Sequence, residues 1–169
     1  MKKVTLDPGI TVFPMPAAVI SVGKGDEANL IALAYVGKVC LEPPIVVISI
    51  QPKRHSYHLI EKHSEFVINY PTIDQLKEID YCGTRSGRNV NKWKELNLTK
   101  EQASIVQVPM IKEFPWNVEC KVINRIKLAS SPFPTEITAA GIGKTVIPGS
   151  RVTFCIFKFP SYFILILAK

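Results

Sequence analysis

Apolar runs and alternating patterns divide the first 128 residues into short extended segments. Ile45–Ile50 (IVVISI) is β-branched and almost wholly apolar, which is typical of a strand buried on both faces. Asn117–Leu128 (NVECKVINRIKL) starts in strict alternation, with Glu119 and Lys121 on the face opposite its first apolar side chains. The same reasoning predicts further strands at Thr11–Val22, Asn29–Cys40 and Glu65–Tyr70.

Prolines and glycines limit these segments. Pro14 and Pro16 restrict the first segment to an edge strand or to two short strands, because proline cannot donate to a β-ladder. Gly37 inside the second segment indicates a bulge or a close approach of another backbone. Pro43 and Pro44 end that strand.

Three short helices are predicted between the strands. Ser56–His63 is a short helix, and Thr72–Ile79 is a weaker candidate. Asn89–Leu96 has apolar residues at three-residue spacing, including Trp93, so they share one face. A chain of 169 residues has the length of one domain, and this mixture predicts a mainly β fold: a β-barrel with small helical insertions.

The composition changes after Leu128. Residues 1–128 carry 17 basic and 13 acidic residues, whereas residues 129–169 carry four basic residues and one acidic residue. Phe154–Ala168 is very apolar, but Lys158 and Pro160 interrupt it and it is too short to span a bilayer. We therefore expect residues 1–128 to form most of the domain and 129–169 to be a divergent segment of it, through sequence drift or a shifted reading frame.

The charge balance points to an anionic ligand. Lys and Arg number 21 against 14 Asp and Glu, so the net charge is +7, which suits phosphate esters, nucleic acid or a membrane surface. The four cysteines, at positions 40, 82, 120 and 155, are too far apart for a zinc knuckle or a CxxC centre. Free thiols and an N-terminus without an apolar signal segment favour a reducing cytoplasm.

One basic cluster follows the buried strand Ile45–Ile50. Lys53 and Arg54 come directly before Ser56, which is predicted to cap the next helix. A helix start offers free N–H donors and a partial positive charge, so this cluster suits a phosphate monoester. The alternative is an ordinary cap beside solvated bases.

A second basic cluster lies at residues 84–92 (TRSGRNVNK). Arg88 and Lys92 are four residues apart and would share one helix face. Such a face is often simply solvated, but together the two clusters would form opposite walls of an anion pocket.

Other chemistry-bearing residues give weaker signals. His55 and His58 lie three apart without a third metal ligand nearby, so all three histidines of the chain, with His63, are expected at the surface. Tyr35 would stack on a flat ring or fill the core. We find no Ser-His-Asp order, nucleophile elbow, P-loop or GxGxxG motif, and therefore no catalytic side chain.

Taken together, five segments resemble the flavin reductase-like family, in particular its flavoredoxin-type members, which bind FMN in a split β-barrel. They lie in order over about residues 1–128: 29–44, 47–59, 65–69, 81–93 and 115–121. The resemblance implies that β-strand residues line the flavin and its ribityl chain while the basic loops hold its phosphate. The implied cofactor-binding residues are Asn29, Ala32, Ala34, Tyr35, Lys53, Arg54, Ser56, Tyr57 and Lys92.

The same resemblance implies an FMN-binding oxidoreductase that passes electrons from reduced nicotinamide or a redox protein to an acceptor, and a homodimer. Ser131 stands about where the family has a flavin-site histidine, so we expect weak FMN retention. The alternatives are a non-catalytic FMN-binding protein and a basic β-barrel that binds nucleic acid, with Tyr57 and Trp93 among the bases as a stacking platform.

Overall fold

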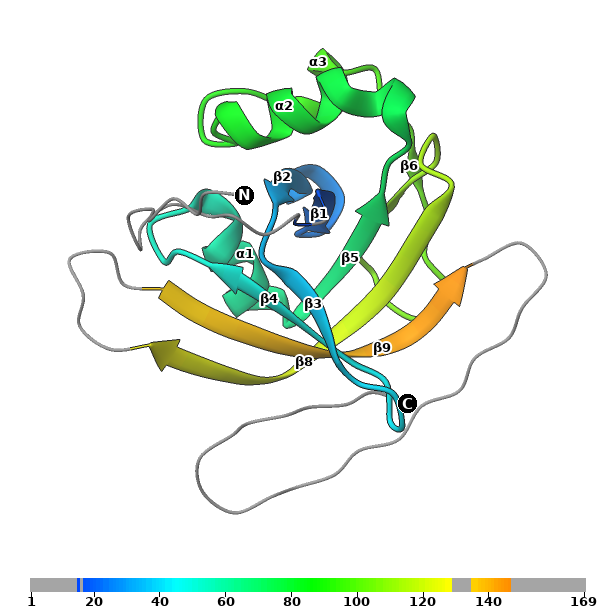
Figure 1. Cartoon of the computed structure of the whole chain (residues 1–169). Helices are drawn as coiled ribbons and strands as arrows, with labels where there is room; N and C mark the ends of the chain where they lie inside the picture. Colours follow the sequence, from blue (N-terminus) through cyan, green and yellow to red (C-terminus); the bar gives the residue numbers. More distant parts are fainter. Residues whose placement is uncertain (1–14, 16, 129–134, 147–169) are drawn as a thin grey trace, which may run out of the picture.

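The computed structural model describes residues 15, 17–128 and 135–146 (Figure 1). Within them the chain is mainly β, with short helices between strands, as predicted. The strands are β1 (Ala18–Val22), β2 (Asn29–Leu33), β3 (Val36–Cys40), β4 (Ile45–Ile50), β5 (Glu65–Tyr70), β6 (Lys100–Glu101), β7 (Met110–Ile111), β8 (Trp116–Leu128) and β9 (Thr135–Val146). The helices are α1 (His55–His63), α2 (Leu76–Thr84) and α3 (Lys92–Glu95), with 3-10 turns η1 (Gly25–Glu27) and η2 (Ile73–Gln75).

Seven strands form one sheet in the order β2-β1-β5-β8-β9-β4-β3, with antiparallel neighbours. The end strands β2 and β3 are consecutive in the chain and are separated only by Ala34 and Tyr35. The sheet therefore curls so that its end strands lie near each other, but β2 and β3 do not pair and the barrel stays open. At this junction the Ser49 N–H donates to the Tyr35 carbonyl at 3.0 Å, so β4 is tied to the split between the end strands.

Strand β9 links the two halves of the curled sheet. It pairs with β8 from Asn117 to Leu128 and with β4 from Ile45 to Ile50. Without β9, the sheet would separate into β2-β1-β5-β8 and β4-β3, because β8 and β4 do not pair with each other. The segment whose composition diverges from the rest of the chain thus supplies a central strand, while residues 147–169 lie outside the described part.

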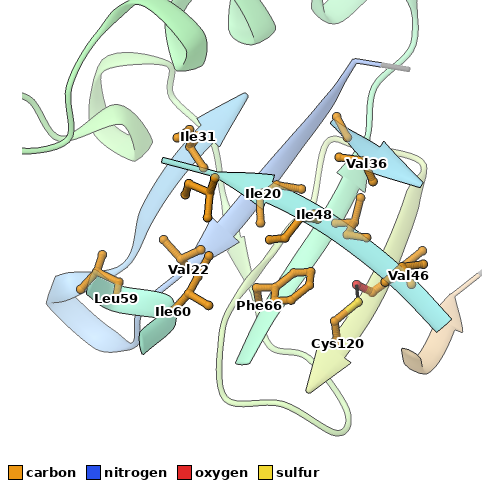
Figure 2. Packing of buried hydrophobic residues seen from close by; sticks show 14 of the residues in the cluster. Ile20, Val22, Ile31, Val36, Val46, Ile48, Leu59, Ile60, Phe66 and Cys120 are labelled. Carbon is orange, nitrogen blue, oxygen red and sulfur yellow. Dashed lines mark hydrogen bonds between the residues drawn. The ribbon is translucent and has the colours of Figure 1, made fainter. Parts of the chain in front are cut away.

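The main core fills the inside of the curl. Figure 2 shows apolar side chains of β1, β4 and β5 meeting Leu59 and Ile60 of α1, with Cys120 of β8 beside Phe66. Ile20, Ile48 and Phe66 are fully buried. Burying each large apolar side chain contributes about 1.5–3 kcal/mol, so this cluster holds the sheet in its curved form.

A second, smaller apolar cluster attaches α2 and α3 to the outer face of β1 and β2 (Figure 1). Cys82 of α2 and Trp93 of α3 pack there against Val19 and Leu30. A Cβ placed on Gly83 would lie 3.5 Å from Ala32 Cβ, an ordinary van der Waals contact, so α2 lies directly against β2. This packing sets the position of the segment that follows α2.

Several element boundaries differ from the prediction. The segment Asn29–Cys40 breaks at Ala34–Tyr35, and its bulge falls between Lys38 and Cys40, so Gly37 marks neither feature. The predicted helix Thr72–Ile79 is a 3-10 turn at its start, and α2 runs on to Thr84, where Cys82 is its one buried residue. Strand β1 covers Ala18–Val22 and pairs with both β2 and β5, so the expectation of an edge strand is wrong, and most of the predicted segment before it lies outside the described residues. Helix α3 is shorter than expected and covers only Lys92–Glu95.

Candidate functional site

A cavity of about 320 Å³ opens where the two basic clusters meet. It is lined by Asn29 and Ile31 of β2, residues 53–56 at the start of α1, residues 82–88 at the end of α2 and beyond it, and Lys92. We call it the cationic cavity. The clusters are about 30 residues apart along the chain, and the structure brings them together as opposite walls, as predicted.

The lining of the cationic cavity is strongly positive. It holds five basic side chains and no carboxylate: Lys53, Arg54, Arg85, Arg88 and Lys92. Among the residues that the structure describes, Arg54 and Arg88 form no salt bridge with a carboxylate. Several unneutralised cations around one concave space favour an anionic ligand. Arg88 belongs to the second predicted cluster, and Arg85 of the same cluster was not among the predicted cofactor-binding residues.

The start of α1 forms one wall. Arg54 occupies the N-cap position with an extended backbone, so the prediction that Ser56 caps this helix is wrong. Ser56 is the second helical residue, is buried, and accepts a hydrogen bond at 2.9 Å from the Asn29 side-chain amide. The first N–H groups of a nine-residue helix therefore lie at the cavity edge, where they favour an anion.

Asn29 joins the two walls. Its amide group donates to Ser56 on one side and lies directly against Gly87 on the other. A Cβ at Gly87 would overlap the Asn29 side chain, so this position needs glycine. Asn29 is itself 6% exposed, and its position is thus fixed by both walls.

Lys92 is the most buried cation of the cavity, with 2% of its surface exposed. Its Nζ donates to the carbonyl of Leu30 at 2.7 Å and to that of Cys82 at 2.8 Å. Burial lowers the pKa of Lys92, and the Arg54 charge lowers it further. Because an ammonium has three donors, one N–H is left for a ligand.

Lys92 and Arg88 do not share a helix face, contrary to the prediction. Helix α3 begins at Lys92, whereas Arg88 lies in the turn before it, where the Asn89 N–H donates to the Ser86 carbonyl. The glycine turn brings both cations to the cavity without a common helix.

His55 also lines the cavity, and the His63 side chain is only 15% exposed, so the expectation that all three histidines lie at the surface holds only for His58. His55 is partly buried, and its pKa is lowered first by burial and then by the positive charge of Arg88. His63 instead contacts Glu27 Oε2 at 3.1 Å. The described residues contain no cluster of three or more metal-ligating side chains.

Four of the predicted binding residues do not line the cationic cavity. Ala32 is partly buried and Ala34 exposed, at the end of β2 that leads away from the cavity. Tyr35 is 57% exposed at the split in the sheet. Tyr57 is 6% exposed and packs in the main core, so it attaches α1 to the sheet and does not face the cavity.

The described cysteines are all unpaired. Burial raises the pKa of Cys82, which lines the cavity, to about 11 and that of Cys120 well above its usual range. Both are therefore thiols at neutral pH, with little nucleophilic character. In the described part of the chain no helix is long and apolar enough to cross a membrane.

The aromatic platform needed for nucleic-acid stacking is absent at the two residues considered for it. Tyr57 is 6% exposed and Trp93 is 4% exposed, because each packs in an apolar cluster. Neither ring face is therefore available to a base.

Comparison with known proteins identifies the family to which the chain belongs. The family model described as "Flavin reductase like domain" matches residues 10–149, so the resemblance extends past Leu128 into β9. An uncharacterized protein of Pyrococcus abyssi is 37% identical over 111 residues, which cover 66% of this chain and 63% of that protein. The chain thus spans less than two thirds of the length of this curated relative.

Two solved structures of flavoredoxins have the same fold. Flavoredoxin from Methanosarcina acetivorans superposes with a TM-score of 0.75 at 25% identity, covering 88% of this chain and 77% of that one. Flavoredoxin of Desulfovibrio vulgaris (Miyazaki F) also has a TM-score of 0.75, at 22% identity, and covers 94% of this chain and 97% of that one. The fold is that of the split-barrel flavin reductases.

Proposed function

Because this chain belongs to the flavin reductase like domain family, we propose that it is a flavin-dependent oxidoreductase whose cationic cavity holds the phosphate of FMN. The observation that carries this proposal is the meeting of five basic side chains, without a carboxylate, around one cavity. A phosphate monoester has about 1.5 to 2 negative charges at neutral pH, which these cations would neutralise.

The residues present fit a phosphate dianion in three ways. Arg54 and Arg88 offer guanidinium groups without a carboxylate partner among the described residues. The start of α1 offers backbone N–H donors. The third N–H of Lys92 is not used by the carbonyls of Leu30 and Cys82.

The flavin ring would then lie along β2, on the side away from the phosphate. Asn29 stands at the cavity and Tyr35 at the far end of the strand, and six residues of extended chain span about 20 Å. Ala32 and Ala34 have small side chains, and Tyr35 presents an exposed ring there. These residues would supply the apolar contacts that a flat tricycle requires.

When bound, the flavin supplies the hydride and electron chemistry, and the protein supplies position and electrostatic field. Asn29, Lys53, Arg54, Ser56 and Lys92 would bind and orient its phosphate and ribityl chain, with Tyr57 holding α1 in place. We infer no protein acid, base or nucleophile. Reduced nicotinamide or a redox protein would deliver the electrons, and a second small molecule or protein would accept them.

We also propose that the chain acts as a homodimer. Tyr35 at the β2–β3 junction and Leu41 in the turn after β3 are 57% and 73% exposed, and a second copy would cover these apolar side chains. Light scattering after size exclusion would test this, and a monomer at micromolar concentration would contradict it.

Flavin titration followed by fluorescence tests the binding site. Replacing Arg54 by Ala should weaken FMN about tenfold, because a hydrogen bond to a charged group contributes about 1.5–3 kcal/mol. Riboflavin lacks the phosphate, so its affinity should not change. Lys77→Ala removes the same charge from an exposed position in α2 outside the cavity and should leave FMN binding unchanged.

Two results would contradict the assignment. Equal loss of FMN and riboflavin affinity in Arg54→Ala would mean that this residue does not contact phosphate. Equal FMN affinity in the parent chain and in Arg54→Ala would remove the phosphate from this cavity. Steady-state oxidation of NADH and NADPH with added FMN then separates a reductase from a non-catalytic FMN-binding protein, and FMN content on purification tests the expected weak retention.

A further inference from the structure

We propose that His55 takes up a proton when a phosphate binds in the cationic cavity, so that FMN binds more tightly as the pH falls from about 8 to about 6.5. The inference rests on the proposed function, because it takes the flavin phosphate to lie in this cavity. It adds regulation by pH to the site, through a histidine that is not among the residues assigned to the flavin.

His55 lies on the boundary between two cavities. It is the first residue of α1 and lines the cationic cavity, and it also lines an adjoining cavity of about 310 Å³ between residues 26–29 and residues 87–91. The cationic cavity, at about 320 Å³, is small compared with the screening length of about 10 Å at 0.1 M salt. A phosphate bound anywhere in it therefore acts on the charge of His55.

The surroundings of His55 disfavour its protonated form in the flavin-free chain. Burial is the first cause of its lowered pKa. Four titratable groups add to this effect or oppose it: Arg88 of the turn after α2, His58 of α1, Lys92 of α3 and Glu27 of η1. The first three lower the pKa, whereas Glu27 raises it. Because the usual pKa is 6.5, the side chain of His55 is mainly neutral at pH 7.5 before a ligand binds.

Glu27 supplies only a small part of the negative charge that a protonated His55 needs. Its carboxylate accepts hydrogen bonds from Lys62 Nζ at 2.7 and 2.8 Å and contacts His63 Nε2 at 3.1 Å, so these partners already neutralise it. The other bases of the cationic cavity add positive charge: Lys53, Arg54 and Arg85. Within the described residues, the counter-charge for a protonated His55 is therefore left to a bound anion.

A bound phosphate monoester reverses this balance. Its charge of about −2 favours the imidazolium about fivefold, even at a distance of about 8 Å and at the dielectric constant of water. The imidazolium also has an N–H on both ring nitrogens, so it gains a donor for a phosphate oxygen. Protonation and phosphate binding thus favour each other. By linkage, the dissociation constant of FMN should fall about threefold between pH 8 and pH 6.5.

The proton of the phosphate itself gives an effect of the opposite sign. A phosphate monoester has a second pKa of about 6, and surrounding cations favour its dianion, so this group releases protons when it binds. At pH 7.5 the free phosphate is already almost completely dianionic, and its release of protons is therefore close to zero. Proton uptake measured at this pH belongs to the protein.

The experiment is calorimetric titration of the full chain with FMN at pH 7.5, in Tris and in triethanolamine buffers, whose ionisation enthalpies differ. The difference between the two binding enthalpies gives the number of protons taken up per FMN. We expect about 0.2 proton for the parent chain and none when riboflavin replaces FMN. His55→Gln should abolish the uptake and flatten the pH dependence of the FMN dissociation constant between pH 8 and pH 6.5.

The matched control is His58→Gln. His58 is an exposed histidine of the same helix, three residues further on, and it lines neither cavity. This variant should keep both the proton uptake and the pH dependence of FMN binding. Circular dichroism should show that both variants are folded.

Three outcomes would overturn the inference alone. Absence of proton uptake by the parent chain, with FMN bound more tightly than riboflavin and weakened by Arg54→Ala, would reject the role of His55 and keep the proposed function. Uptake that persists in His55→Gln would assign the proton to another group, such as Lys92. Equal uptake with riboflavin would separate the proton from the phosphate. Failure of the chain to bind FMN would reject the inference and the proposed function together.

Discussion

Substitution of Lys92 distinguishes a structural role from a ligand-binding role, because the two roles predict opposite changes in the free energy of unfolding. The Lys92 ammonium joins β2 to α2 through the carbonyls of Leu30 and Cys82 at 2.7 and 2.8 Å, and 2% of the residue is exposed. Lys92→Met keeps the length of the side chain and removes the charge. We therefore expect this variant to report the role of the ammonium itself.

The magnitude follows from the two carbonyls. Each buried acceptor left without a donor costs about 1–3 kcal/mol, so two cost about 2–6 kcal/mol. Part of this is recovered, because the methionine requires no desolvation of a charge and no longer repels Arg54, two effects that also lower the pKa of Lys92. We expect a net loss of about 3 kcal/mol in the free energy of unfolding.

Urea unfolding of the flavin-free chain, followed by tryptophan fluorescence, measures this loss as a lower midpoint at constant slope. Lys94→Met, an exposed position two residues further along α3, should change the free energy of unfolding by less than about 0.5 kcal/mol. If Lys92 served only a ligand, its removal would relieve repulsion and raise the midpoint. A midpoint for Lys92→Met at or above that of Lys94→Met would refute the structural role.

Three further outcomes follow from the site and its supports. Gly87→Ala should displace Asn29 and weaken FMN at least tenfold, measured by flavin titration, because the new Cβ would overlap the asparagine side chain. Glu119→Gln should lower the free energy of unfolding by about 2–4 kcal/mol in urea, since the fully buried carboxylate accepts N–H groups of residues 104–106 at 3.0, 2.6 and 3.1 Å. His55 has a pKa below its usual 6.5, so the unfolded chain binds more protons there and stability should fall as the pH drops below 6.5. His55→Gln should make the urea midpoint less sensitive to pH between 7.5 and 5, and an unchanged pH dependence would contradict this.

The strands could be predicted because their patterns are local. Ile45–Ile50 forms β4 with the predicted bounds, and Glu65–Tyr70 forms β5 in the same way. The break in Asn29–Cys40 could not be placed, because it results from the two halves pairing with different neighbours, β1 and β4. Pairing partners depend on the whole topology, and a glycine in the segment carries no information on them.

The position of the cationic cavity could be predicted in part because its basic residues are dense along the sequence. Two basic clusters at residues 51–57 and 84–92 were enough to suggest opposite walls of one pocket, and both walls line the cationic cavity. The role of Lys92 as a donor to buried carbonyls could not be foreseen, since a basic residue near a helix start is usually solvated. His55 was missed for the same reason: its burial depends on how the turn at Gly87 packs against Asn29.

The distribution of acidic partners argues that the cationic cavity is reserved for an external anion. Two carboxylates, Asp26 and Glu27, lie in the adjoining cavity, yet Glu27 pairs with Lys62 and His63 on its far side. Arg54 and Arg88 are left without a carboxylate in the described structure, and their charges repel Lys92 and His55. Such repulsion costs stability, and Glu27 offsets it only in part at His55. An anion bound in the cavity would relieve it, and a ligand at a hundred times its dissociation constant would add about 2.7 kcal/mol to the free energy of unfolding.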